Sequence, residues 1–402
     1  HAIQLSDAVM ICHYDGPQPY ETDFSGDLTG HMGQVGTATG GVIFRPGKFG
    51  KAVQVAEATT NYVLNPVSGG SGNITARGSA TVTIGSTDTG YLATTSTKVV
   101  TTASGDGVDY TLSALANAAH TVSVALDVTG LTTLECSLDG STWHALTEQY
   151  EFGGWYIYTA TAIPAVECNG STTLAIRQTD AAARTVYIGA AQVEQKSYPT
   201  PFAHGDMGDG HTWSGTAHAS TSDRVIAKLS YDADVLDANE GTVMLWVIPL
   251  MHLDGTYAGS APSYADILTL AWIGTGRFNL ETDATVSGIM RPRWNYDGGP
   301  LAGYYEHNII ATSENHYAFV WSASAGYTRL YHNGVLVAEN SSFAGWGGDG
   351  TVLSFNRENK IPPVLIDDLA VLSSALDADT IRAIYESGAP VFAESSSWGF
   401  RA

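Results

Sequence analysis

Charged side chains are scarce in this 402-residue sequence, and basic ones are the scarcest. Only 14% of the residues are charged, whereas a typical globular domain has about 25%. Lysine and arginine together number 18 against 40 acidic residues, which gives a formal net charge of −22 at pH 7. Binding to nucleic acid or to anionic membranes needs a basic surface. The sequence therefore predicts no nucleic-acid partner and no attraction to anionic lipid.

Cysteine and long apolar runs are also scarce. The three cysteines, Cys12, Cys136 and Cys168, are too few for a disulfide framework. Either Cys136 and Cys168 form one disulfide or the cysteines are buried thiols, since free cysteine is commonly a small core hydrophobe. No apolar run reaches the roughly 18 residues that a membrane span needs. Membrane insertion is therefore not expected.

Short strand-like runs dominate what is present. Alternating apolar and polar residues recur between turn residues, and long helical patterns are nearly absent apart from residues 377–386. The strongest single signal lies in residues 316–339, where Asn333-Gly334 separates two apolar runs. An Asn-Gly pair between β-branched and aromatic residues favours a tight hairpin, because both central residues need a positive φ. The stretch predicts three consecutive antiparallel strands.

A family resemblance becomes visible around this hairpin. Four segments, in chain order, resemble the strands of the laminin-G-like, concanavalin A-like lectin and glucanase jelly roll. The resemblance implies an all-β sandwich and, since this fold carries many functions, little about activity. The four segments are residues 47–55 (GKFGKAVQV), 241–249 (GTVMLWVIP), 316–339 and 365–381.

A second resemblance interrupts the first one. Five segments are similar to the jelly roll of carbohydrate-binding modules, a type common in glycanases and phage tail proteins. The interruption predicts two jelly-roll β-sandwiches, one inserted into an early loop of the other. Residues 1–60 and 205–402 would form the outer sandwich and residues 61–200 the inserted one. The five segments are residues 60–66, 108–113, 120–128, 154–162 and 185–194.

Residues 205–224, GDMGDGHTWSGTAHASTSDR, follow the expected exit from the insert. The segment resembles a stretch that recurs in phage tail and virion proteins. This resemblance implies a place on the virion surface or outside the cell, with other virion proteins as partners. Trp213, set among small polar residues, is predicted to anchor a contact between modules or subunits. We therefore expect a homo-oligomer, with a trimer favoured; the alternative is a monomer in which Trp213 caps the outer core.

Glycan binding needs exposed aromatic faces with polar groups beside them. Residues 290–305 are expected to form such a loop, and Trp346 lies in a second one. The alternative for these aromatics is that they cover a core edge or a subunit interface. The strand tryptophans Trp246, Trp272 and Trp321 are assigned to the core. The glycan-binding candidates are Trp294, Tyr296, Tyr304, Tyr305 and Trp346.

Calcium is the metal that the sequence suits best, because it prefers carboxylate and loop carbonyl oxygens. Asp206 and Asp209 lie in a glycine-rich loop, and Asp367 and Asp368 lie on the expected closing strand. These four aspartates are the candidate calcium ligands. In the inserted module, the position where the related family carries a calcium-binding aspartate is Gly189. The 12 histidines show no zinc-binding spacing.

Catalysis has little support in the sequence. Glu281 and Asp283 have the alternate spacing of glucanase carboxylates, but residues 284–286 lack a further one. We therefore expect a non-enzymatic phage virion protein, of the tail or capsid surface, with lectin-like domains. It would serve assembly, decoration or attachment to host-surface glycans. The alternatives are a secreted or cell-surface glycan-binding module and, less favoured, a glycoside hydrolase.

Overall fold

The computed structural model shows an all-β protein in which nearly all strand pairs are antiparallel. The described residues divide into two compact units. The outer sandwich consists of residues before Glu57 and after Ile226, and the inserted sandwich consists of Glu57–Ile226. No helix among the described residues is long and apolar enough to cross a membrane. The described residues are 3–5, 8–12, 36–70, 72–128, 133–253, 265–272, 276–283, 291–297, 305–306, 308–346, 350–356, 364–388 and 391–393.

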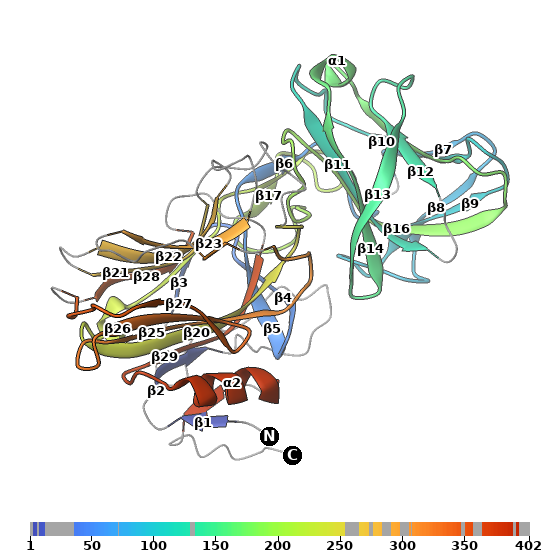
Figure 1. Ribbon diagram of the computed structural model, residues 1–402. Coiled ribbons are helices and arrows are strands. Elements are labelled where there is room, and N and C mark those ends of the chain that lie inside the picture. Colours follow the sequence, from blue (N-terminus) through green and yellow to red (C-terminus); the bar gives the residue numbers. More distant parts are fainter. Residues whose placement is uncertain are drawn as a thin grey trace, which may run out of the picture. The chain divides into compact units, whose positions relative to one another are not determined.

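The outer sandwich has two large sheets, which form separate layers in Figure 1. The first is ordered β27 (Val335–Asn340), β26 (Tyr327–His332), β25 (Asn315–Ser322), β20 (Glu240–Pro249), β29 (Val364–Leu372), β5 (Gly50–Val55) and β4 (Ile43–Gly47), with β2 (Ala8–Cys12) also paired to β29. The second is ordered β24 (Tyr305–Glu306), β23 (Arg291–Asp297), β22 (Gly276–Asp283), β21 (Ala265–Trp272), β28 (Gly350–Phe355), β19 (Lys228–Tyr231) and β3 (Thr37–Thr39). The short η1 (Ala233–Val235) follows β19, and β1 (Ile3–Leu5) pairs in parallel with β30 (Val391–Ala393).

The central strands of the first sheet are apolar on both faces because both faces are covered. Every residue of β25 and of β29 is buried. One face packs in the main core, which includes Phe319, Trp321 and Phe355. The helix α2 (Ala378–Ser387) lies beside the other face and buries Ile381 and Ile384 there. Such two-sided burial explains why these strands read as near-continuous apolar runs.

Several local predictions are confirmed in the outer sandwich. Asn333 and Gly334 both have positive φ, 50° and 74°, in the turn between β26 and β27. The predicted helix is α2, which begins after Asp377 and ends at Gly388 in the left-handed region. Asp377 accepts a hydrogen bond from the Thr380 N–H at 2.8 Å, which satisfies one of the free amide groups of the first turn.

The expectation of a loop over residues 290–305 was wrong for part of that stretch. Residues 291–297 form β23, which pairs along its length with β22. Residue Tyr305 belongs to β24, which pairs with β23. Asn, Asp, Gly and Pro around these strands favour turns, but continuous pairing with a central strand outweighs that local preference.

The inserted sandwich is built from one long sheet that bends at its middle strand, β13 (His144–Phe152), which pairs with β12 on one side and with β14 on the other. The two halves of the sheet enclose a core. Small residues and aliphatic side chains fill this core, which includes Val122, Leu126 and Leu174. The sheet is ordered β7 (Ile74–Arg77), β10 (Gly107–Thr111), β15 (Thr173–Gln178), β12 (Leu134–Ser137), β13 (His144–Phe152), β14 (Trp155–Ile163), β11 (His120–Val128), β16 (Arg184–Glu194), β9 (Ser96–Thr101) and β8 (Thr81–Ser86). A separate small sheet joins β17 (His211–Trp213), β18 (Ser222–Arg224) and β6 (Thr59–Asn61).

The cysteines are buried thiols. Cys12, Cys136 and Cys168 are all buried, and none of them forms a disulfide. Burial raises the pKa of Cys136 to about 12 and that of Cys168 to about 11. Both thiols of the inserted sandwich are therefore uncharged at neutral pH and belong to its packing.

The insert extends further along the chain than residues 61–200, and this corrects the predicted boundary. Strand β18 pairs with β6 at the entry to the insert, so residues 201–226 belong to the inserted sandwich. The Arg224 side chain is 1% exposed and donates to the carbonyl oxygens of Glu57 (3.0 Å) and Pro201 (2.6 Å). Two prolines favour an extended linker, yet this segment packs back onto its own module.

Candidate functional site

The outward face of the sheet β7-β10-β15-β12 carries two ion pairs in a row. Arg77 on β7 donates to the Asp109 carboxylate on β10 at 2.6 and 3.2 Å. Arg177 on β15 donates to one carboxylate oxygen of Glu135 on β12 at 3.1 and 2.9 Å. Gly107 lies between the two arginines in the strand register. All four charged side chains are partly exposed, so the face offers both donors and acceptors to solvent.

Trp143 lies against this row of charges. It is the residue before β13 and is half-buried. The guanidinium carbon of Arg177 is 3.6 Å from the centre of the Trp143 ring, and that of Arg77 is 5.3 Å away. These contacts are cation–π interactions. They hold the indole in a fixed orientation at the surface of the sheet.

The turn before Trp143 is rigid because Asp139 organises it. Its carboxylate accepts hydrogen bonds from the amides of Ser141 and Thr142 at 2.8 and 2.6 Å, and from the Thr142 hydroxyl at 2.8 Å. Desolvation opposes ionisation, but these hydrogen bonds outweigh it and hold the pKa of Asp139 well below its usual range. Asp139 is therefore a permanent anion at neutral pH.

The short helix α1 (Ala165–Cys168) lies across from this turn. Its Glu167 contacts His144 of β13, with 2.5 Å between the carboxylate oxygen and Nε2. Its Cys168 is buried, whereas Val166 is 82% exposed. The Ser171 hydroxyl, just beyond α1, donates to the Leu138 carbonyl oxygen. These contacts fix the position of α1 beside the β12–β13 turn.

The turn, the helix α1 and the strands enclose a polar depression of about 510 Å³. A volume of this order is typical of small-ligand sites. Its lining is rich in hydroxyl, carboxylate and amide groups, with Val166 as an exposed aliphatic member. The lining residues are Arg77, Asp109, Ser137, Leu138, Asp139, Gly140, Val166, Glu167, Asn169, Gly170, Ser171, Thr172, Thr173 and Ala175.

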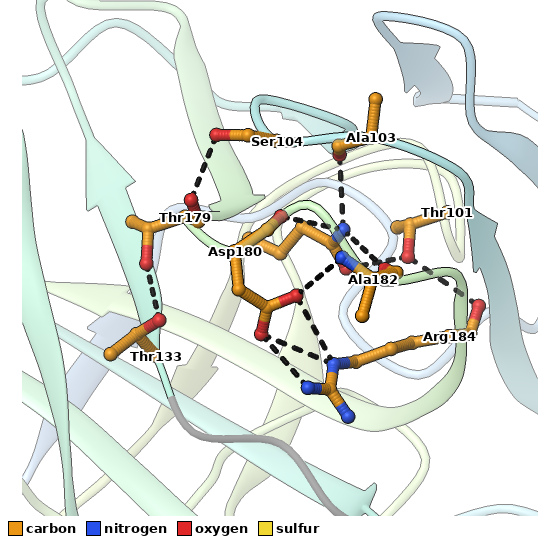
Figure 2. Close-up of polar contacts among 9 residues, drawn as sticks. Thr101, Ala103, Ser104, Thr133, Thr179, Asp180, Ala182 and Arg184 are labelled. Carbon is orange, nitrogen blue, oxygen red and sulfur yellow. Dashed lines mark hydrogen bonds and ion pairs between the residues drawn. The ribbon is translucent and has the colours of Figure 1, made fainter.

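A polar network anchors the end of β15, next to Arg177. The Gln178 amide nitrogen donates to the carbonyl oxygens of Ala103, Asp180 and Ala182 at 2.9 to 3.0 Å. Figure 2 shows the neighbouring contacts, in which Arg184 bonds the Asp180 carboxylate. Because the Gln178 side chain points inward and is fixed by these hydrogen bonds, the adjacent Arg177 is held on the outward face.

A separate cavity of about 20 Å³ lies in the core and is lined partly by Leu126 and Ile188. It has space for about one water molecule.

Sequence reasoning missed this site. Its residues come from β7, β10, β12, β15 and the start of β13, and antiparallel pairing brings them together over about 100 residues of sequence. One signal was available in Asp139-Gly140-Ser141-Thr142-Trp143, since a run of turn-forming residues favours the surface and places the following Trp143 at a strand end. The strand alternation around Asp109 and Arg177 was a second signal.

Three of the five candidate glycan-binding aromatics lie on strands of the outer sandwich. Trp294 pairs with Leu280 on one side and with Tyr305 on the other, and Tyr296 pairs with Phe278. Their side chains, and all of Tyr304, lie outside the described residues. The backbone register brings Trp294 and Tyr305 together, and their role in glycan binding stays a prediction.

Trp346 does not present an exposed face, which corrects its assignment. It is 4% exposed and belongs to the main core of the outer sandwich. Its ring packs edge-on against Phe343, with 5.0 Å between the ring centres. The core assignment is confirmed for Trp246 and Trp321, at 3% and 0% exposed. The side chain of Trp272 on β21 lies outside the described residues.

The four candidate calcium ligands belong to two different units, Asp206 and Asp209 to the inserted sandwich and Asp367 and Asp368 to the outer sandwich. Asp367 and Asp368 lie in the centre of β29 and are buried, and Asp367 accepts a hydrogen bond from the Phe49 amide at 2.9 Å. Asp206 is exposed and accepts from the Trp213 indole at 2.9 Å; Asp209 is also exposed. Across the described part of the chain, no group of three or more His, Cys, Asp or Glu is placed to hold a metal. Calcium binding stays a prediction.

Gly189 shows why the inserted module departs from the related family. A Cβ atom there would lie 2.4 Å from the Tyr91 Cβ and 2.8 Å from a ring carbon of Trp155. A carboxylate has no room at this position, since contacts below 3 Å force a neighbour to move. The other carboxylate candidates, Glu281 and Asp283, lie on β22 with side chains outside the described residues.

The fold and the site together define a two-sandwich β protein with a polar, tryptophan-bearing face on its inserted module. No family model and no curated protein matches the sequence. Among solved structures, domain 4 of AbnA, a GH43 extracellular arabinanase from Geobacillus stearothermophilus in complex with arabinotriose, is 17% identical with a TM-score of 0.30. That likeness covers 46% of this chain and 85% of the other.

Two further solved structures are similar at the same level. The receptor-binding domain of botulinum neurotoxin D is 16% identical with a TM-score of 0.29, over 40% of this chain and 41% of that one. A native heptameric SAP-like pentraxin from Limulus polyphemus is 13% identical with a TM-score of 0.30, over 41% and 78% of the two chains. Scores this low carry no argument about function, which has to come from the site itself.

Proposed function

We propose that this chain binds carbohydrate, and does not chemically alter it, through the outward face of the inserted sandwich. The observation that carries the proposal is the half-buried Trp143, oriented by Arg177 and Arg77 beside a polar depression of about 510 Å³. A sugar ring has an apolar face that stacks on an indole and a rim of hydroxyls that needs donors and acceptors. The site supplies both kinds of contact.

The ion pairs suit hydroxyl recognition. The Arg77–Asp109 and Arg177–Glu135 pairs each place donors next to acceptors on an open face. A pair of neighbouring sugar hydroxyls can accept from the guanidinium and donate to the carboxylate. Since the side chains are already held in place by their partners, little conformational entropy is lost when the sugar binds.

The electrostatics of the depression favour binding over hydrolysis. A glycoside hydrolase needs a carboxyl group that stays protonated, with a raised pKa, to act as general acid. The pKa of Asp139 is lowered instead. Asp109 is paired with Arg77, and Glu167 contacts His144. The carboxylates of the depression are therefore arranged as hydrogen-bond acceptors.

We further propose that the chain belongs to a virus particle, as a phage tail or capsid-surface protein that attaches to host-surface glycans. The support is the resemblance of residues 205–224 to a recurrent virion segment. In that segment Trp213 packs on His218, with 4.8 Å between ring centres, and donates to Asp206. A homo-oligomer with other virion proteins as neighbours is part of this proposal. A secreted glycan-binding module is the alternative; recovery of the chain from purified particles separates the two.

Replacing Trp143 by alanine is expected to lower glycan affinity at least about 30-fold, because removal of a central tryptophan contact typically costs about 2 kcal/mol or more. The measurement is retention on a glycan array, followed by titration calorimetry with the best ligand. Tyr187→Ala is the matched control, since it removes a partly exposed aromatic residue of the same sandwich that also contacts a cation, Lys98, but lies outside the site. The affinity of this variant should equal that of the wild type. Unchanged binding by Trp143→Ala, with Tm also unchanged, would show that the site lies elsewhere.

A further inference from the structure

The aliphatic side chain of Val166 is exposed to solvent and is not part of the packing of the inserted sandwich. It is 82% exposed on α1, and it lines the polar depression. The helix is held by other residues: Cys168 is buried, and Glu167 contacts His144. Single exposed aliphatic residues are common, but this one projects into a lining that is otherwise made mainly of hydroxyl, amide and charged groups.

The charges of the depression are the second observation. Among the described lining residues, Arg77 is the one basic side chain, and its guanidinium is engaged by Asp109. Asp139 and Glu167 add negative charge on the walls. A carboxylate or sulfate on a ligand would therefore meet two like charges, and the charge of the one cation in that lining is already balanced by Asp109, which disfavours anionic sugars.

We propose that the depression takes an uncharged sugar that bears a methyl group, either the acetamido group of an N-acetyl sugar or the C6 methyl of a 6-deoxy sugar. This inference rests on the proposed function. The methyl group would cover Val166, and the hydroxyls would bond Asn169, Ser171 and the Arg77–Asp109 pair. The contact removes apolar surface from water on both partners, which is worth about fourfold in affinity for one buried methyl group.

The test uses the full chain and matched sugar pairs in titration calorimetry. Chitotetraose against cellotetraose compares acetamido with hydroxyl groups, and fucosides against galactosides of the same L series compare a C6 methyl with a C6 hydroxyl. Polygalacturonate supplies the anionic arm. We expect the methyl-bearing member of at least one pair to bind about fourfold tighter than its partner, with no binding of polygalacturonate.

Two variants tie this preference to Val166. Val166→Ser should abolish it while leaving the hydroxyl-bearing partner unaffected, and Val166→Ile should retain it. Equal binding within both pairs, a preference that survives Val166→Ser, or preferential binding of polygalacturonate would each overturn the inference while leaving glycan binding intact. Absence of binding to these sugars and to a glycan array would contradict the proposed function as well.

Discussion

Replacing Arg224 by alanine is expected to lower the free energy of unfolding of the inserted sandwich by about 3 to 5 kcal/mol. The guanidinium is buried and donates to the carbonyls of Glu57 and Pro201 and, at 3.1 Å, to the Thr200 hydroxyl. The buried Glu194 carboxylate, also bonded by Thr200, lies in the same network. Removal of Arg224 leaves that anion without its compensating charge and removes the side-chain hydrogen bond from β18 to Glu57 at the entry to the insert.

The measurement is urea unfolding of the full chain, followed by circular dichroism and by fluorescence. Arg329→Ala is the matched control. Arg329 forms a partly exposed ion pair with Glu339 on the outer sandwich, and such pairs contribute little to stability. An Arg224→Ala protein that unfolds at the same urea concentration as the wild type would show that the exit segment does not hold the insert closed.

Lowering the pH from 7 to 5 is expected to destabilise the outer sandwich by about 2.7 kcal/mol for each pH unit once the pH is below 6. Burial, with smaller contributions from His332 and Lys48, lowers the pKa of His316 to about 3, and burial lowers that of His332 to about 4. In the unfolded chain both have a pKa near 6.5. Between pH 6.5 and pH 4 the unfolded chain takes up a proton on each histidine, whereas the folded chain does not. The contribution of the two neutral histidines to the free energy of unfolding is therefore complete above pH 6.5 and is lost as the pH falls toward 4.

This acid sensitivity is measured from urea midpoints at pH 7.0, 6.0 and 5.0. His332→Asn should reduce the slope by the equivalent of one proton, to about 1.4 kcal/mol per pH unit. His218→Gln, in the inserted sandwich and partly exposed, should leave the slope of the outer sandwich unchanged. A stability that does not change between pH 7 and 5 would mean that both histidines are protonated in the folded state.

The elements that were predicted correctly are those with strong local signals. The Asn333-Gly334 turn requires two positive φ values, and the apolar run at residues 241–249 lies within β20. The helix at α2 has an Asp377 cap and one apolar side. In each case a few neighbouring residues specify the conformation, so no knowledge of distant contacts was needed.

The errors lie where distant contacts decide. The boundary of the insert was placed at residue 200 because two prolines indicated a linker, whereas Arg224 and the pairing of β18 with β6 extend the module to Ile226. Trp346, in a glycine-rich stretch, reads as exposed but is buried on Phe343. The site around Trp143 depends on strand register, which single-residue patterns do not reveal.

Hydrogen–deuterium exchange can show directly whether the inserted sandwich binds glycan through the face around Trp143. The full chain is compared with and without a saturating amount of the tightest-binding glycan from the array. We expect slower exchange in peptides that cover residues 137–144 and 165–173, with little change across β23 and β24. Protection confined to the outer sandwich, in peptides covering residues 291–306, would contradict glycan binding by the inserted sandwich.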